Sequence, residues 1–175
     1  MFDILLRFRT FKTALVADIE KAFLQIAINE HDRDFLRFLW FDDVFSEQPK
    51  VVRNRFARVI FGVTSSPYLL NETICKHTQK YEFDVNFVKK VLESFYVDDF
   101  VSGENSFESA FELFKKLKLR FLEGSFNLKK WNTNNHNLRK LICENEKEIT
   151  KNSKVLGILW EETMETLIYD FRLCR

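Results

Sequence analysis

The sequence predicts an α+β fold in which helices cover one face of an antiparallel sheet. Two observations predict it: helical and strand-like hydrophobic patterns alternate with short connections, and the clearest strands, around residues 95–101, form a hairpin. The chain has 175 residues, of which 46% are hydrophobic, so it is long enough for one domain with a real core. We therefore expect a single domain over residues 1–175.

The first predicted strand ends in an acid. Residues 14–17 (Ala-Leu-Val-Ala) have the apolar pattern of a buried strand, and Asp18 follows at its carboxyl end. Apolar residues at helical spacing over 20–28 indicate a short helix. Residues 35–41 and 53–61 are then predicted as two strands joined by a loop.

Two helices are predicted before the hairpin. Ser66 and Pro67 favour a helix start, because Ser accepts hydrogen bonds from free backbone N–H groups and Pro lacks the donor that the first turn leaves unpaired. We expect this helix to extend to about residue 81, and a second one to occupy 86–94 and lead directly into the hairpin.

The hairpin carries two adjacent carboxylates at its turn. Residues 95–97 (Phe-Tyr-Val) and 100–101 (Phe-Val) are apolar, and Asp98 and Asp99 lie between them. This pattern is typical of two short strands joined by a tight turn. Both acids are therefore expected at the tip.

The remaining elements follow the hairpin. Residues 105–108 (Asn-Ser-Phe-Glu) supply a helix cap, and apolar residues at helical spacing continue to Phe121. An extended segment is predicted at 126–128, a helix at 138–144 and a strand at 155–160.

Charge and cysteine content exclude some classes of protein. The formal net charge is only +1, so bulk charge does not indicate a nucleic-acid partner. Residues 1–10 lack the apolar core of a signal peptide, and the longest uncharged run, 59–71, is too short to span a bilayer. Cys75, Cys143 and Cys174 have no zinc-site spacing, so we expect a reduced intracellular protein without disulfides.

The acids of the hairpin indicate a metal site. Adjacent carboxylates repel each other, and a divalent cation compensates the repulsion. Magnesium prefers oxygen ligands and often takes one or two carboxylates. Asp98 and Asp18 can supply such ligands if their strands are neighbours. Two ordinary interpretations stay open: Asp98 and Asp99 as a surface turn, and Asp18 as a helix cap.

Five blocks carry a resemblance to a known family. They are residues 18–23 (DIEKAF), 61–67 (FGVTSSP), 96–99 (YVDD), 124–131 (GSFNLKKW) and 156–160 (LGILW). In this order they resemble the reverse transcriptases of retroelements, and most closely those of the BEL/Pao class of LTR retrotransposons. The resemblance covers nearly the whole chain.

The resemblance implies RNA-directed DNA synthesis on a polymerase palm. Asp18 and Asp98 would bind two Mg²⁺ ions, for which Mn²⁺ is a candidate substitute. Asp99 would complete the acidic cluster, and the backbone carbonyl of Ile19 would join the second metal. In such a site one ion activates the primer 3′-hydroxyl and the other stabilises the leaving pyrophosphate.

The resemblance also implies a nucleotide site. Phe23 would be the aromatic gate that collides with a ribose 2′-hydroxyl, and Phe61 and Gly62 would form the floor of the pocket for the incoming nucleotide. Lys129, or its neighbour Lys130, would protonate or neutralise the leaving pyrophosphate. Ordinary alternatives stay open: core packing for Phe23, a turn for Gly62 and a solvated basic pair for the lysines.

The last block resembles the strand that grips the primer, here Leu156, Gly157 and Ile158. The partners implied are an RNA or DNA template with its primer, deoxynucleoside triphosphates and other regions of the parent polyprotein. No membrane partner is expected. The implied location is the cytoplasmic particle of a retroelement.

Two regions of a working reverse transcriptase are expected to be largely missing. Residues 1–17 and 161–175 are too few for fingers and a thumb, so we expect a palm fragment of a larger polyprotein. One hypothesis is a fragment of an active polymerase. The other is a non-catalytic relic or domesticated fragment that binds nucleic acid or another partner. A nucleotidyl cyclase would also place acids on a hairpin, but it does not predict the other blocks.

Overall fold

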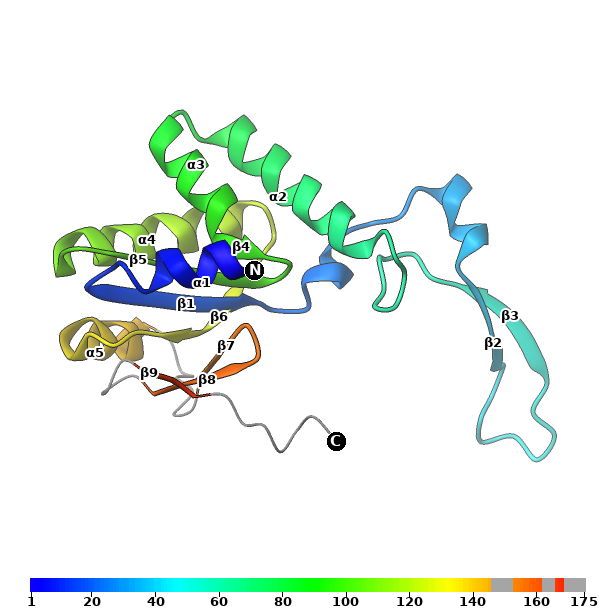
Figure 1. Cartoon of the computed structure of the whole chain (residues 1–175). Coiled ribbons are helices and arrows are strands. Elements are labelled where there is room, and N and C mark those ends of the chain that lie inside the picture. The colour runs from blue at the N-terminus through cyan, green and yellow to red at the C-terminus, as the bar shows by residue number, and fades with distance from the viewer. Residues whose placement is uncertain (146–152, 162–165, 169–175) are drawn as a thin grey trace. The chain divides into compact units, whose positions relative to one another are not determined.

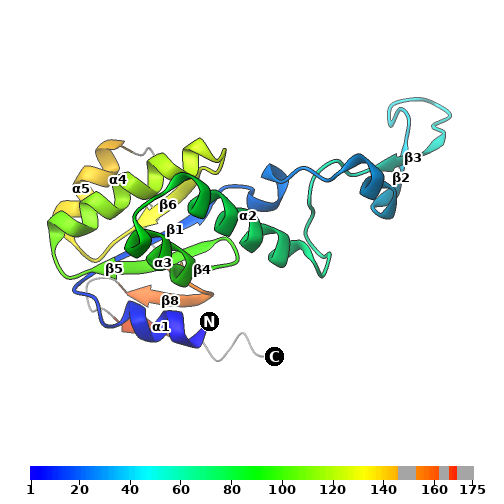
Figure 2. The same ribbon diagram turned by 90° about the horizontal axis from the view of Figure 1, so that it is seen from above.

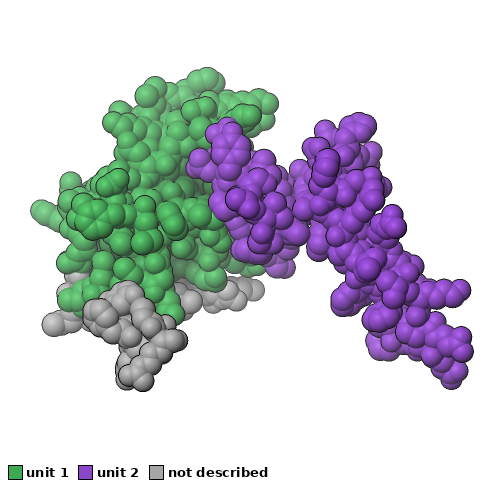
Figure 3. Space-filling view, turned by 45° about the vertical axis from the view of Figure 1, so that its right-hand side comes forward, with its two compact units in different colours: residues 1–20, 74–175 green, residues 21–73 purple. Residues whose placement is uncertain are grey.

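A computed structural model of the chain describes residues 1–145, 153–161 and 166–168 (Figure 1). The chain divides into two compact units, coloured separately in Figure 3. Unit 1 contains residues 1–20 and 74–175, and unit 2 contains residues 21–73. The single domain expected from the sequence stays a prediction.

Unit 1 is built on a four-stranded antiparallel sheet with the strand order β4-β5-β1-β6. The strands are β1 (Thr13–Ile19), β4 (Phe95–Tyr96), β5 (Asp99–Glu104) and β6 (Leu128–Asn132). The predicted strand at 14–17 and the predicted hairpin are therefore neighbours, and the α+β class is confirmed.

Five α-helices occur in the described residues. They are α1 (Phe2–Phe8), α2 (Ser66–Tyr81), α3 (Val85–Ser94), α4 (Phe107–Glu123) and α5 (His136–Asn145). Four of them match predicted helices to within about two residues. The sequence did not predict α1, which is only seven residues long and has no side-chain hydrogen bond at its N-cap.

The four-stranded sheet is covered on both faces. Val16 of β1 and Val101 of β5 share one face and belong to a cluster with Phe8 of α1 and with Val155 and Trp160 near the C-terminus. The expectation that helices cover only one face was therefore wrong for α1. This helix packs there because Ile4 and Phe8 form an apolar stripe at i,i+4 spacing.

The opposite face carries the larger aromatic core. Phe100 of β5 contacts Phe95, and the ring of Phe95 stacks on that of Phe121 in α4 with a centroid distance of 5.0 Å. Phe114 of α4 meets the fully buried Trp131 of β6 edge to face at 4.8 Å. Figures 1 and 2 show α4 along the sheet, where it contacts β1, β5 and β6.

A small antiparallel sheet follows in the C-terminal part, with the order β7-β8-β9. Its strands are β7 (Ser153–Val155), β8 (Ile158–Glu161) and β9 (Thr166–Ile168). The strand predicted at 155–160 is therefore a hairpin. Leu156 and Gly157 both have positive φ, 51° and 83°, as a tight two-residue turn between twisted strands requires.

Unit 2 contains one β-hairpin, β2 (Arg37–Phe41) with β3 (Val51–Arg55), and ends with the first half of α2. Two short 3₁₀ helices, η1 (Ala22–Gln25) and η2 (Glu30–Phe35), precede the hairpin. The helix predicted over 20–28 is thus only η1, and the strand predicted over 53–61 is regular only up to Arg55.

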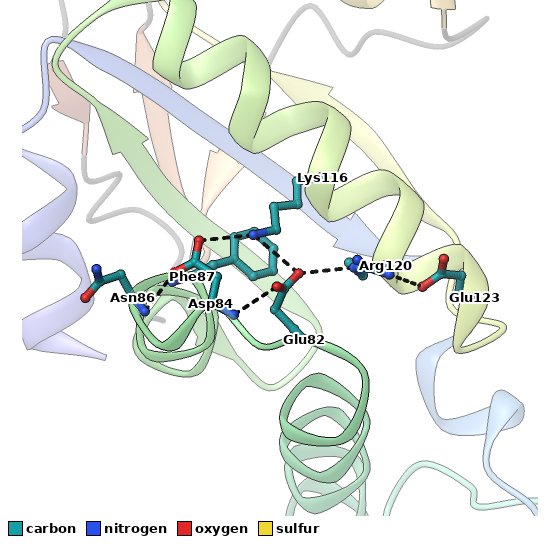
Figure 4. A network of polar contacts seen from close by, with 7 residues as sticks. All are labelled: Glu82, Asp84, Asn86, Phe87, Lys116, Arg120 and Glu123. Atoms are coloured by element: carbon teal, nitrogen blue, oxygen red, sulfur yellow. Dashed lines mark hydrogen bonds and ion pairs between the residues drawn. The ribbon is translucent and has the colours of Figure 1, made fainter.

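An ion-pair network joins the start of α3 to α4 (Figure 4). Asp84 caps α3 by accepting hydrogen bonds from two backbone N–H groups of its first turn, and it also pairs with Lys116 of α4 at 3.1 Å. Glu82 pairs with Lys116 at 3.3 Å and with Arg120 at 3.1 Å. Burial raises the pKa of Glu82, but the N–H of Asp84 and the two cations outweigh it and lower that pKa. The network fixes α3, which leads directly into the acidic hairpin.

Two further sequence expectations concern cysteines and membranes. Cys75 and Cys143 are free thiols, and Cys174 lies outside the described residues. Within the described ranges, the chain has no helix with the length and apolar character needed to cross a membrane.

The packing of α4 can be tested with two leucines of the same helix. Leu117 is 0% exposed and Leu119 is 55% exposed. We expect Leu117→Ala to lower the free energy of unfolding by about 2–5 kcal/mol, because it leaves a cavity in the core. Leu119→Ala should change it by less than about 0.5 kcal/mol. Urea denaturation measures both, and equal losses would contradict this orientation of α4.

Candidate active site

The acids of two distant sequence blocks meet on neighbouring strands. In the antiparallel pairing of β1 with β5, Asp18 lies directly opposite Asp99. The pairing continues past the strand end, where the Ile19 N–H donates to the carbonyl oxygen of Asp98 at 3.0 Å. Asp18, Asp98 and Asp99 are all only partly exposed. The sheet register therefore collects all three acids at one end of unit 1.

The turn that carries the acids contains a strained residue. Tyr96 pairs with Asp99, so Val97 and Asp98 form the turn itself. Val97 has a φ of 57°, a left-handed conformation that a β-branched side chain disfavours. Such positions cost on the order of 1–3 kcal/mol and persist where the surrounding structure enforces them. The strained Val97 thus lies in the turn that places Asp98 and Asp99 beside Asp18.

Crowding of like charges perturbs the carboxyl groups. Burial raises the pKa of Asp99 to about 6, together with the negative charges of Asp98 and Asp18 and against the charge of Lys130. Burial and the charge of Asp18 also raise the pKa of Asp98, although its own N–H and Lys130 act in the opposite direction. The protein thus holds carboxylates closer together than their charges favour.

A lysine from the next strand lies among these acids. The Nζ atom of Lys130 in β6 is 2.8 Å from Oδ2 of Asp18. That hydrogen bond raises the pKa of Lys130, and the charges of Asp99 and Asp98 add to the effect although desolvation opposes it. Lys130 is therefore a fully charged counter-ion of the acids.

A β-bulge gives Lys130 its position. Opposite Ala17 of β1, the strand β6 places two residues, Lys130 and Trp131, so the register shifts there. Lys130 has a φ of 53°. Bulges bend a strand and redirect a side chain, and they are frequent next to functional sites.

Lys129, the first of the two lysines named from the sequence, has a different partner. Its Nζ atom is 3.1 Å from Oε1 of Glu20, and the Asn127 amide donates to Oε2 of the same carboxylate at 3.1 Å. The structure therefore brings Lys130, rather than Lys129, into contact with Asp18.

A cavity of about 380 Å³ adjoins the acids within unit 1. Asp18, Asp99 and Lys130 line one part of it. Lys154 and the Leu156–Gly157 turn of the C-terminal hairpin line another part. Ile158, the third residue of that block, begins β8 immediately after the turn. The cavity thus combines oxygen ligands, two ammonium groups and an apolar turn.

The residues expected to contact the incoming nucleotide lie in unit 2. The rings of Phe23 and Phe61 meet edge to face with centroids 4.7 Å apart, and Phe23 is buried while Phe61 is exposed. Gly62 follows with a φ of 86°, a conformation that favours glycine. These three residues therefore form one local cluster around a turn.

The donor atoms suit a hard divalent cation. Three carboxylates supply oxygen, and Mg²⁺ commonly takes one or two protein carboxylates with water or phosphate in its other positions. In the described ranges, no three His, Cys, Asp or Glu side chains are arranged to hold a single ion together. An ion held by Asp18 and Asp99 would therefore take its remaining ligands from water or substrate.

Comparison with known proteins gives no family assignment. No protein-family model matches the chain, and no curated protein matches it. The five blocks and the geometry of the acids are the observations that bear on its function.

Sequence reasoning missed three features of the site. It did not find the strained Val97, the bulge that selects Lys130 over Lys129, or Lys154 at the cavity. No signal in the sequence marks the first two, because Gly or Asn is the usual residue at positive φ. Lys154 directly precedes the Val155 at which the last strand was expected to begin, and only the hairpin shows that it shares a cavity with the acids.

The raised pKa of Asp99 makes a prediction about pH. A carboxyl whose folded pKa is about 6 rather than 3.8 contributes stability that is fully present below pH 3.8 and lost as pH rises through 6. In EDTA, the free energy of unfolding of the wild type should therefore fall between pH 4 and pH 7 relative to that of Asp99→Asn. Urea denaturation across this range measures the difference, and a difference independent of pH would contradict the burial of Asp99.

Proposed function

We propose that this chain is the palm region of a reverse transcriptase and that Asp18, Asp98 and Asp99 serve metal-dependent nucleotidyl transfer. One observation carries the proposal: the register of β1 against β5 sets Asp18 opposite Asp99. Two of the five blocks named from the sequence, far apart along the chain, thereby share one site. If the blocks resembled the family only by chance, nothing would require their acids to lie on neighbouring strands.

The three acids would hold the metal ions through carboxylate oxygens, with Asp18 and Asp98 as the principal ligands and the Ile19 carbonyl as a further candidate. Two bound Mg²⁺ or Mn²⁺ ions would supply activation of the primer 3′-hydroxyl and stabilisation of the leaving pyrophosphate. The carboxylates themselves are preorganised for this, since the strand pairing holds them together against their mutual repulsion.

The cavity beside the acids supports a role in binding the primer. Lys130 and Lys154 supply positive charge for phosphate groups, and the Leu156–Gly157 turn presents backbone next to them. This agrees with the resemblance of residues 156–158 to a primer grip. An RNA or DNA template annealed to a primer is therefore the proposed partner, and deoxynucleoside triphosphates are the proposed substrates.

Unit 2 supports a role in nucleotide selection. Phe23 is held in place by its contact with Phe61, so it would act as a rigid aromatic wall against a 2′-hydroxyl. Gly62 leaves open space where a side chain would stand, which suits close approach of a ligand to the backbone.

The proposed function is tested by primer extension. We expect the chain to add deoxynucleotides to a primer on an RNA template with Mg²⁺ or Mn²⁺. Asp18→Asn and Asp98→Asn should each lower the rate at least about 100-fold, because each removes a metal ligand worth several kcal/mol. Asp3→Asn, an exposed acid in α1, serves as the matched control and should leave the rate unchanged.

The same assay separates the enzyme from the relic. Wild-type protein that is folded and binds primer–template but extends nothing would contradict the enzyme and favour a non-catalytic nucleic-acid-binding module. Extension that survives Asp98→Asn would contradict the assignment of the acids.

A further inference from the structure

Lys130 has a backbone conformation that needs an explanation. Its φ of 53° lies in the left-handed region, where a residue other than glycine costs on the order of 1–3 kcal/mol. Its ion pair with Asp18 is largely at the surface, since 57% of the Lys130 side chain is exposed. Exposed ion pairs of this kind contribute only about 0–1 kcal/mol. Stability alone therefore does not account for the conformation.

The bulge lets two consecutive lysines reach the same side of the sheet. In a regular strand, successive side chains point to opposite faces. Here Lys129 lies opposite Asp18 in the pairing of β6 with β1 and bonds to Glu20, the residue that follows β1, while Lys130 also reaches Asp18. The extra residue of β6 makes this double contact possible. Its effect is to add a second ammonium group at the acidic site.

That ammonium group lies where a cation would bind. It is 2.8 Å from an oxygen of Asp18, and its charge also offsets the repulsion among Asp18, Asp98 and Asp99. The Lys130 side chain also lines the 380 Å³ cavity. It therefore has space to move into when it leaves Asp18.

We propose that Lys130 is a positioning residue that stands in for a divalent cation in the metal-free protein and competes with that cation for Asp18. The inference rests on the proposed metal site and adds a side chain of the same chain that competes with the metal ion for Asp18. While no metal is bound, Lys130 holds Asp18 in place and limits repulsion. When a metal ion arrives, the ammonium group must leave the Asp18 oxygen.

The test measures Mn²⁺ binding to the whole chain, without nucleic acid, by electron paramagnetic resonance. Lys130→Met should bind Mn²⁺ about 30-fold more tightly than the wild type, the effect of removing one positive charge about 4 Å from a doubly charged ion in water. Lys129→Met is the matched control, since it removes the neighbouring charge beside Glu20, and it should change the affinity less than about twofold. Lys130→Arg keeps the charge and should restore wild-type affinity.

A second variant, Lys130→Gly, keeps the test valid if Lys130→Met does not fold. Lys130→Gly also lacks the ammonium group, and glycine adopts the left-handed conformation without strain. It should bind Mn²⁺ as tightly as Lys130→Met. Its melting temperature should also rise more on adding Mn²⁺ than that of the wild type, which a merely structural role for Lys130 does not predict.

The outcomes separate this inference from the proposed function. Unchanged or weaker Mn²⁺ binding by both Lys130→Met and Lys130→Gly overturns the inference, while Mn²⁺ binding that Asp18→Asn abolishes still supports the metal site. Absence of Mn²⁺ binding by the wild type, Lys130→Met and Lys130→Gly alike overturns both.

Discussion

The antiparallel pairing of β1 with β5 is the constraint on which the site depends. It sets Asp18 against Asp99, and so brings acids from two distant parts of the chain to one end of the sheet. A shift by one residue would turn Asp18 to the opposite face, into the aromatic core around Phe100. The two strands approach closely at the other end of the pairing. A Cβ atom on Gly103 would lie 2.5 Å from the Thr13 carbonyl oxygen, so only glycine fits there. The same glycine that permits the strands to meet therefore also helps to fix where the acids lie.

The acidic end of unit 1 combines three departures from low-energy structure. Val97 and Lys130 have left-handed backbones, and Asp99 is half-buried beside like charges. Each departure costs free energy, and each is adjacent to the others in space. The buried contacts of α4 and the ion pairs of Glu82 and Asp84 hold the surrounding elements in place and offset that cost. Strained residues held by well-packed neighbours are what a preorganised site requires.

Most of the fold was predictable from local patterns, whereas the details of the site were not. Helices such as α2 and α4 were found because caps and hydrophobic spacing are local signals, and the hairpin at Asp98 was found because its acids interrupt an apolar run. The side of the sheet that α1 covers depends on long-range packing, which periodicity does not report. The choice of Lys130 over Lys129 depends on one extra residue in β6, and no residue type there signals a bulge. Local chemistry therefore identified the acids, while tertiary register decided their partners.

The two-fold crossing of the chain between the units determines which residues a change of loop length would affect. The chain leaves unit 1 after Glu20, two residues beyond Asp18, and returns at Ile74 within α2. Everything between is an insertion with its own internal contacts, and it contains Phe23, Phe61 and Gly62. We expect changes of length in the β2–β3 loop to leave the pairing of β1 with β5 intact, because β2 and β3 form a separate sheet. A change of length in that loop would alter the unit that holds the residues proposed to recognise the nucleotide and leave the acids of unit 1 in place.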